Sequence, residues 1–361
     1  MPINHYVTLG RSGLRVSPFC LGAMTFGTDW GFGASAKDSE AILSRYFDLG
    51  GNFIDTANVY TKGHSEKIIG DWIKKKPIRR DRLVLATKFF GTLYPGDPNA
   101  GGASRKSMIA ACENSLRRLR TDYIDLYWMP AHARNPPIEE TMRGLDDLIR
   151  AGKVRYAGFS DTPAWKTAQA QLIAQFRGWS PLIALQIEYS LLERTVEVEL
   201  IPMALELGLG VTPWSPLKYG ILSGKYTRAN RGKIKAARGA WLESALNERA
   251  YEVVDVLSEV AKEAKTSPAR AALAWVQAQP GVASTILGVR TMEQLDDNLA
   301  ALELRLSPKQ FERLAAATKP ELNFPAAFLE GSGSFANGGT VVNGVDNPAS
   351  GIAPKSESEV Y

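Results

Sequence analysis

The fold is decided by residues 123–176, which read YIDLYWMPAHARNPPIEETMRGLDDLIRAGKVRYAGFSDTPAWKTAQAQLIAQF. Two short apolar runs, 123–127 and 155–159, alternate there with two amphipathic stretches, 138–151 and 163–176. Gly152 lies just past the first amphipathic stretch, and Pro163 opens the second as a first-turn proline. Strands that alternate with helices form a parallel sheet with crossover helices, so this stretch predicts two consecutive strand–helix units.

The same alternation continues over most of the chain. Further strands are expected at 19–22, 52–55, 83–87, 183–186, 210–213 and 283–287, and further helices at 37–49, 65–75, 105–119 and 251–265. Residues 6–18 form two alternating runs around an Arg-Ser-Gly turn, which predicts an N-terminal β-hairpin. Eight units in one unbroken series favour an α/β fold with a single closed (β/α)8 TIM barrel. An open doubly wound sheet needs a G-x-G-x-x-G turn after its first strand, and the sequence has none.

Composition limits the classes of function. Of 361 residues, 45% are hydrophobic and 22% are charged, which is ordinary for a globular enzyme. The net charge of +5 is spread along the chain, which argues against nucleic-acid binding. The absence of a signal-peptide pattern and of any apolar run of about 18 residues predicts a cytoplasmic protein with no membrane span. Cys20 and Cys112 have no metal-ligand spacing, so we expect buried free thiols and no metal site.

The alternation stops near residue 320. Residues 321–361 are rich in Gly, Ser, Asn and Ala, a composition typical of a flexible tail. We therefore divide the chain into a barrel, residues 1–320, and a C-terminal tail, residues 321–361. The tail is expected to pack near the barrel mouth, where it would act as a lid.

Polar residues follow several of the predicted strands, and the C-terminal ends of barrel strands are where chemistry occurs. Asp55 ends one strand, Tyr60 lies just after it, and Lys88 ends the next. A lysine ammonium close to a tyrosine favours the phenolate and lowers the tyrosine pKa, and an aspartate fixes the lysine. These three residues predict an acid–base site, although a structural Asp–Lys pair beside a surface tyrosine remains the alternative at this point.

A second group lies near the last predicted strand. Arg290 precedes a helical stretch in which Gln294 and Asn298 lie four and eight residues further on, so the three share one face. An arginine at a helix N-terminus suits a phosphate group. The alternative is a solvated helix face.

From about residue 9 to residue 319, the sequence resembles the aldo-keto reductase superfamily. The resemblance rests on motifs in the family order, which include Asp55-Thr-Ala-Asn-Val-Tyr60, Ala86-Thr-Lys88, Asp122-Tyr-Ile-Asp-Leu-Tyr127, Trp214-Ser-Pro-Leu217, Gly220-Ile-Leu-Ser-Gly-Lys-Tyr226 and Gly288-Val-Arg290. The resemblance implies NADP(H)-dependent interconversion of a carbonyl and an alcohol, with small-molecule substrates. It implies three members of the family's catalytic tetrad: Asp55, Tyr60 and Lys88.

The resemblance also implies a cofactor site along the barrel mouth. It assigns the nicotinamide amide to Ser160, Asp161 and Gln186, and ring stacking to Trp214. It assigns the pyrophosphate to the segment Ser215, Pro216, Leu217, Lys218, Gly220, Leu222, Gly224 and Lys225. It assigns the adenosine 2′-phosphate to Arg290, Gln294 and Asn298.

Two positions depart from the family pattern. Asp161 stands where an asparagine is usual, and it keeps an acceptor but loses the donor. Pro130 stands where the family has the fourth tetrad member, a histidine, and proline offers neither a side-chain donor nor a backbone N–H. His132, two residues on, would face the same way only if the strand continued.

The departures leave three interpretations of function. The first is a working carbonyl/alcohol oxidoreductase with Tyr60 as general acid and base. The second is an NADP(H)-binding sensor or partner-binding module with vestigial activity. The third is a barrel of another class, an interpretation that no motif in the sequence supports. The substrate pocket is expected at Pro130 and His132. Its apolar lining favours a bulky or aromatic substrate and is expected to consist of Met24, Phe26, Trp30, Phe89, Phe90 and Trp128.

Overall fold

The computed structural model describes residues 1–76, 78–89, 91–130, 136–231, 242 and 244–360. The chain forms two compact units, Met1–Lys319 and Pro320–Tyr361. The first unit is a (β/α)8 barrel with an N-terminal antiparallel hairpin of β1 (Val7–Thr8) and β2 (Arg15–Val16). Both the barrel and the hairpin confirm the sequence prediction.

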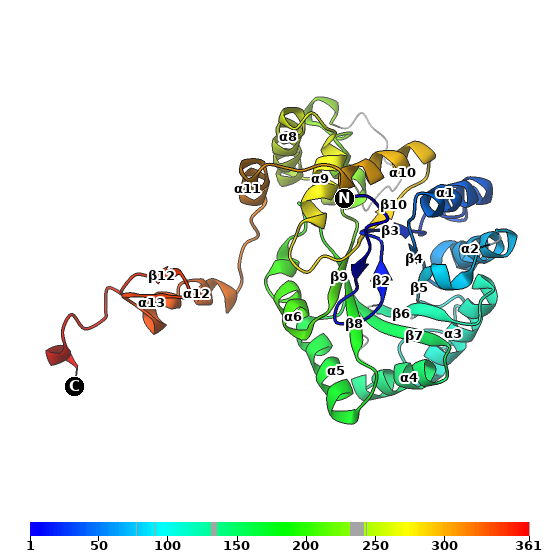
Figure 1. Cartoon of the computed structure of the whole chain (residues 1–361), viewed down its shortest axis with the longest axis horizontal. Coiled ribbons are helices and arrows are strands. Elements are labelled where there is room, and N and C mark those ends of the chain that lie inside the picture. The colour runs from blue at the N-terminus through cyan, green and yellow to red at the C-terminus, as the bar shows by residue number, and fades with distance from the viewer. Residues whose placement is uncertain (77, 90, 131–135, 232–241, 243, 361) are drawn as a thin grey trace. The chain divides into compact units, whose positions relative to one another are not determined.

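The barrel wall is a sheet of eight parallel strands in the order β10-β3-β4-β5-β6-β7-β8-β9 (Figure 1). The strands are β3 (Phe19–Gly22), β4 (Phe53–Asp55), β5 (Val84–Lys88), β6 (Ile124–Pro130), β7 (Val154–Ser160), β8 (Leu182–Glu188), β9 (Gly210–Trp214) and β10 (Thr285–Gly288). Val211 of β9 forms two backbone hydrogen bonds, each 2.9 Å long, with Gly281 and Ala283 in the segment that leads into β10. These bonds nearly close the sheet into a barrel.

Helices follow the strands and cover the outside of the barrel (Figure 1). They are α1 (Ala36–Asp48), α2 (His64–Lys75), α3 (Arg105–Leu119), α4 (Ile138–Arg150), α5 (Ala164–Arg177), α6 (Leu200–Leu207), α8 (Glu248–Glu263), α9 (Pro268–Gln277), α10 (Met292–Leu299) and α11 (Pro308–Ala317). Local signals fix their ends. The Ser104 side chain accepts the Ser107 N–H at the start of α3, and Arg120 ends that helix with a left-handed φ of 52°.

The barrel interior is filled by side chains that alternate along the strands. Phe53 on β4 and both Val84 and Ala86 on β5 point inward, as the period of two predicts. Leu9 and Val16 of the hairpin join the same cluster and cover the barrel floor. This packed floor leaves the last inward positions, Asp55 and Lys88, facing the opposite end.

Both cysteines are free and buried, as expected. No helix among the described residues combines the length and the apolar composition needed to cross a bilayer. The second unit contains α12 (Ala326–Glu330), α13 (Gly333–Ala336) and a hairpin of β11 (Thr340–Val342) with β12 (Val345–Asn347). The expectation that this tail acts as a lid stays a prediction.

Candidate active site

The C-terminal ends of the barrel strands surround a cavity of about 1340 Å³. The final residue of almost every strand lines it: Gly22, Asp55, Lys88, Pro130, Ser160, Trp214 and Gly288. Such a volume exceeds the range of roughly 300–1,000 Å³ that single small-molecule sites occupy, so the cavity has room for more than one small ligand.

A buried ion pair lies at the centre of this ring. Lys88 Nζ pairs with Asp55 Oδ1 and donates a 3.1 Å hydrogen bond to the Thr56 carbonyl oxygen. Gln186 Nε2 donates to the other Asp55 oxygen at 3.1 Å. Asp55 and Lys88 are 2% and 5% exposed, and a buried charge pair of this kind holds its position when its remaining polar atoms are also bonded.

Tyr60 lies beside this pair. It opens a turn, η1 (Tyr60–Gly63), in which Thr61 and Lys62 both take left-handed φ values, 47° and 58°. Lys88 Nζ is 5.2 Å from the centroid of the Tyr60 ring, over its face. Non-glycine residues with positive φ are uncommon and cluster at functional sites.

The pKa of Tyr60 is raised above its ordinary value, which differs from the expectation of a lowered pKa. Burial has the largest effect and raises it, while the Lys88 ammonium acts in the opposite direction. Burial also lowers the pKa of Lys88, but Asp55 and Tyr60 outweigh that effect and raise it, so the lysine stays charged. Tyr60 is therefore a neutral phenol at neutral pH, beside a permanent cation.

Trp214 and Asp161 form a second polar pair at the same mouth. Trp214 Nε1 donates to Asp161 Oδ1 at 2.8 Å, and Ser160 Oγ donates to Asp161 Oδ2 at 3.1 Å. Asp161 has a left-handed φ of 50°. Neighbouring protein atoms desolvate its carboxylate and raise its pKa, while the two hydrogen bonds act to lower it. The tryptophan is thus fixed by a carboxylate where the family pattern has an amide.

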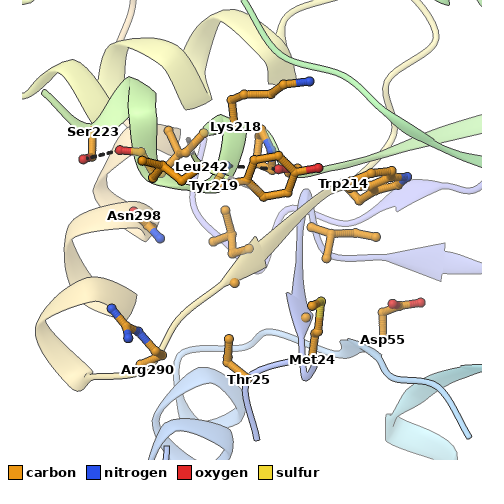
Figure 2. A pocket seen from close by; sticks show the side chains of 18 of the residues that line it. Met24, Thr25, Asp55, Trp214, Lys218, Tyr219, Ser223, Leu242, Arg290 and Asn298 are labelled. Atoms are coloured by element: carbon orange, nitrogen blue, oxygen red, sulfur yellow. Dashed lines mark hydrogen bonds between the residues drawn. The ribbon is translucent and has the colours of Figure 1, made fainter. Parts of the chain in front are cut away.

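The cavity is elongated. Figure 2 shows Asp55 and Trp214 toward one end and Arg290 and Asn298 toward the other. Arg290 precedes α10, and its backbone N–H donates to Gln294 Oε1 at 2.8 Å. Arg290, Gln294 and Asn298 all line the cavity, so the structure brings together the three residues that the spacing placed on one face.

The segment after β9 lies between these two ends. Ser215, Pro216, Leu217, Lys218, Gly220 and Lys225 line the cavity. The ammonium of Lys218 is already paired, 2.7 Å from Glu188 Oε1 and 3.7 Å from Glu193 Oε2. Its side chain is therefore less suited to bind a phosphate than the sequence suggested.

Some expected residues lie elsewhere. Trp128 is fully buried in the barrel interior instead of the substrate pocket, because Gly158 leaves room for its ring: a Cβ on Gly158 would lie 2.4 Å from Trp128 Cζ3. Phe26 and Leu222 belong to the hydrophobic core, and Gly224 packs on Pro268. Trp30 contacts Tyr60 edge-on, with ring centroids 6.2 Å apart, whereas Met24 and Phe89 line the cavity itself. His132 and Phe90 lie outside the described residues.

β6 continues three residues beyond its predicted end, to Pro130, which pairs in register with Ser160. Pro130 lines the cavity together with Tyr60 and Lys88. The position of the family histidine is therefore at the mouth, and a pyrrolidine ring occupies it.

Many of the residues that line the cavity were not identified from the sequence, and two polar ones among them are Asn58 and Arg249. Asn58 lies inside the quoted Asp55–Tyr60 motif, and its Nδ2 donates to the Gly91 carbonyl oxygen at 2.8 Å. Arg249 lies near the start of α8 and lines the same cavity as Arg290. The Asn58 position could have been identified from its motif, whereas nothing in the sequence around Arg249 points to the site. Within the described ranges, no three His, Cys, Asp or Glu side chains are grouped to hold a metal ion.

Comparison with known proteins defines the class. The sequence model that describes the aldo/keto reductase family matches residues 18–319 of this chain. The chain is 40% identical over 310 residues to the uncharacterized oxidoreductase YrpG of Bacillus subtilis, covering 83% of this chain and 92% of that protein. It is 36% identical over 346 residues to an aryl-alcohol dehydrogenase [NADP(+)] of Phanerodontia chrysosporium, covering 90% and 88%. It is 35% identical over 338 residues to the norsolorinic acid reductase stcV of Emericella nidulans, covering 90% and 84%.

The chain belongs to the aldo-keto reductase family. It is an enzyme, an oxidoreductase that interconverts carbonyl and alcohol groups with a nicotinamide cofactor. The resemblance that the sequence motifs indicated is thus confirmed.

Proposed function

We propose that this enzyme is an NADP(H)-dependent aryl-alcohol dehydrogenase, or aryl-aldehyde reductase, in which Tyr60 is the general acid for reduction and the general base for oxidation. The observation that carries the proposal is the placement of the Lys88 ammonium between the Asp55 carboxylate and the face of the Tyr60 ring. The roles proposed for the other site residues are assigned from their positions relative to Asp55, Tyr60 and Lys88.

The acid–base role of Tyr60 is supported by the balance of effects on its pKa. A neutral phenol at neutral pH can give a proton to a carbonyl oxygen during reduction. The adjacent ammonium stabilises the phenolate that forms, because it lies over the ring in a largely buried site where charges interact strongly. Asp55 and Gln186 hold that ammonium in place. In the oxidation direction the same phenolate would accept the alcohol proton.

The residues at this end fit a nicotinamide. Trp214 offers a flat aromatic face, and Ser160, Asp161 and Gln186 offer polar atoms beside it. An amide side chain has several donor and acceptor positions, so Gln186 can bind Asp55 and a carboxamide together. The bound nicotinamide supplies or accepts the hydride.

The far end fits a phosphate. Arg290 contributes a cationic group there, and Gln294 and Asn298 contribute amides, while Arg249 and Lys225 add cations to the lining of the same cavity. Two carboxylates, Glu293 and Asp297, also line it, and Asp297 is paired with Arg270 at 2.7 Å. The Arg290 guanidinium, together with the Gln294 and Asn298 amides, supports NADP(H) over NAD(H), with Arg290 as the residue that binds the additional phosphate.

An aromatic substrate is supported by the walls beside Tyr60. Met24, Val59 and Phe89 line the cavity together with Tyr60, and behind Tyr60 the Trp30 ring packs edge-on against it with centroids 6.2 Å apart and lies tilted to Phe32 at 6.1 Å. The relatives named above include one named for aryl alcohols and one named for norsolorinic acid. The proline at position 130 offers no polar group, so Tyr60 would be the main donor to the carbonyl oxygen.

A substrate screen tests this proposal. Wild-type protein is mixed with NADPH and benzaldehyde, a methoxybenzaldehyde, acetophenone or propanal, and the loss of NADPH absorbance is followed; the alcohols are tested with NADP+. We expect turnover of the aryl aldehydes to exceed that of propanal by about tenfold or more in kcat/KM, about 1.4 kcal/mol of differential transition-state binding. Tight NADPH binding without turnover of any carbonyl or alcohol would reject the proposal and support a binding module.

A further inference from the structure

Glu66 is a fully buried carboxylate that the proposed chemistry does not use. It is the third residue of α2 and is 0% exposed. Arg118 Nε donates to its Oε2 at 2.6 Å, and Thr87 Oγ1 donates to its Oε1 at 2.6 Å. Burial of a carboxylate is costly unless both oxygens are bonded, so this side chain is held in one place by α3 and β5 together.

The two hydrogen bonds of Glu66 connect the segments that carry Tyr60 and Lys88. Helix α2 follows directly after the turn that begins at Tyr60, and Thr87 directly precedes Lys88 on β5. Side chains alternate along a strand, so Thr87 points outward to α2 where Lys88 points inward to the cavity. A single carboxylate therefore connects the backbone next to Lys88 with the helix next to Tyr60.

The turn needs such support because its backbone is strained. Thr61 and Lys62 have left-handed φ values, and each such non-glycine residue carries a conformational cost. Thr61 Oγ1 donates to the Phe26 carbonyl oxygen at 2.7 Å and accepts the Ser65 N–H at 3.0 Å. These bonds hold one side of the turn.

Arg118 holds the other side. It packs so closely on Gly63 that a Cβ at position 63 would lie 3.1 Å from Arg118 Cδ and 3.3 Å from its Nε. The salt bridge to Glu66 fixes the arginine in this position. The turn is thus enclosed between the Thr61 hydroxyl bonds and the Arg118 side chain.

We infer that Glu66, through its bonds to Thr87 and Arg118, is a positioning residue that sets the distance between Tyr60 and the Lys88 ammonium. The inference rests on the proposed role of Tyr60. A displacement of about 1 Å in a catalytic group can reduce turnover by as much as about 100-fold, so loss of this connection should lower kcat without affecting ligand binding.

The test uses Thr87, since removal of Glu66 would leave Arg118 without its carboxylate and the fold itself could fail. Thr87→Val keeps the shape of the residue and removes its hydrogen bond to Glu66, and Thr87→Ser restores the hydroxyl. The matched control is Thr285→Val, which breaks a similar 2.7 Å bond between a buried strand threonine and Gln277 of α9. Measurements are kcat and KM for benzaldehyde, the Kd of NADPH, and the melting temperature, with Tyr60→Phe in parallel.

We expect Thr87→Val to lower kcat about tenfold while KM and the NADPH Kd stay within about twofold, and Thr87→Ser and Thr285→Val to keep kcat near the wild-type value. Equal kcat values for Thr87→Val and Thr285→Val would overturn the inference, as would a Thr87→Ser variant that fails to restore kcat. A joint change of kcat, KM and Kd in Thr87→Val would show a merely structural role. If Tyr60→Phe loses activity and Thr87→Val does not, only this inference fails; if Tyr60→Phe keeps full activity, the proposed function fails with it.

Discussion

The indole N–H of Trp214 donates to the Asp161 carboxylate at 2.8 Å, so the aromatic wall of the cofactor end is fixed by a group that carries a negative charge when ionised. A nicotinamide ring has a positive charge in the oxidised cofactor and none in the reduced one. A carboxylate beside the ring therefore favours the oxidised form over the reduced form.

This relationship predicts the effect of Asp161→Asn. The asparagine keeps an acceptor for Trp214 and removes the charge. Because the wild-type carboxylate carries a negative charge when ionised and the asparagine carries none, we expect the affinity for NADP+ relative to NADPH to fall about 3-fold to 10-fold at alkaline pH, the factor that about 1 kcal/mol of screened charge interaction gives. Fluorescence titration of both cofactors measures the ratio; an unchanged ratio shows that Asp161 has no electrostatic role.

Removal of the Lys88 ammonium should change the pH dependence of catalysis. Burial raises the pKa of Tyr60 and Lys88 acts against that rise, so Lys88→Met should raise the pKa further. Oxidation needs the phenolate and increases as pH rises through this pKa, whereas reduction needs the phenol and decreases. We therefore expect the pH for half-maximal oxidation to move to a higher value in the variant, measured on benzyl alcohol with NADP+.

The control for this experiment addresses the buried partner. Lys88→Met alone leaves Asp55 without its cation, a loss that costs about 3–5 kcal/mol for a buried pair. The double variant Asp55→Asn/Lys88→Met removes both charges and should recover part of that stability, with a smaller shift of the pH profile because Asp55 acts to raise the pKa of Tyr60. A profile in Lys88→Met that matches the wild type would exclude Lys88 as the group that tunes Tyr60.

Arg290→Ala should reduce cofactor discrimination. A charge-assisted bond to phosphate contributes roughly 1.5–3 kcal/mol, so we expect the NADPH Kd to rise about tenfold or more and the NADH Kd to change little. Arg290→Lys keeps the charge and should lose less. Arg313→Ala is the charge-matched control. Arg313 lies on α11, pairs with Glu259 and Glu263 of α8, and does not line the cavity. An alanine variant that still prefers NADPH as strongly as wild type would move the phosphate site elsewhere.

Pro130→His should restore a polar donor at the end of β6. Because Pro130 lines the cavity with Tyr60 and Lys88, an imidazole there can reach the same space. We expect faster turnover of propanal and a narrower range of aryl aldehydes, since the ring fills space that a bulky substrate would use. The ratio of kcat/KM for propanal to that for a methoxybenzaldehyde measures the effect. A ratio equal to that of the wild type would show that position 130 does not contact the substrate.

Much of the barrel was predictable because each element has a local signal. The strand at 19–22 and the helix at 105–119 match the structure residue for residue. The predicted start of α8, at residue 251, was wrong by three residues. The N-cap of this helix, Asn247, whose side chain accepts the Ala250 N–H, was not recognised.

The site was predictable where residue type and strand end coincide, as at Asp55 and Lys88. It was not predictable where two distant segments decide the outcome. Trp128 lies in the barrel core because Gly158 on the next strand leaves it space, and Lys218 is paired with Glu188, which is thirty residues away in sequence. The raised pKa of Tyr60 depends in the same way on burial by surrounding elements, which no local pattern encodes.

The central claim is that Tyr60 transfers the proton, and Tyr60→Phe tests it most directly, since the variant loses the phenolic hydroxyl and keeps the ring beside Lys88 and Trp30. With benzaldehyde and NADPH, we predict a fall in kcat of about 100-fold or more, with an NADPH Kd within about twofold of the wild type. A Tyr60→Phe enzyme that reduces benzaldehyde at the wild-type rate would contradict the account and place the acid on another residue.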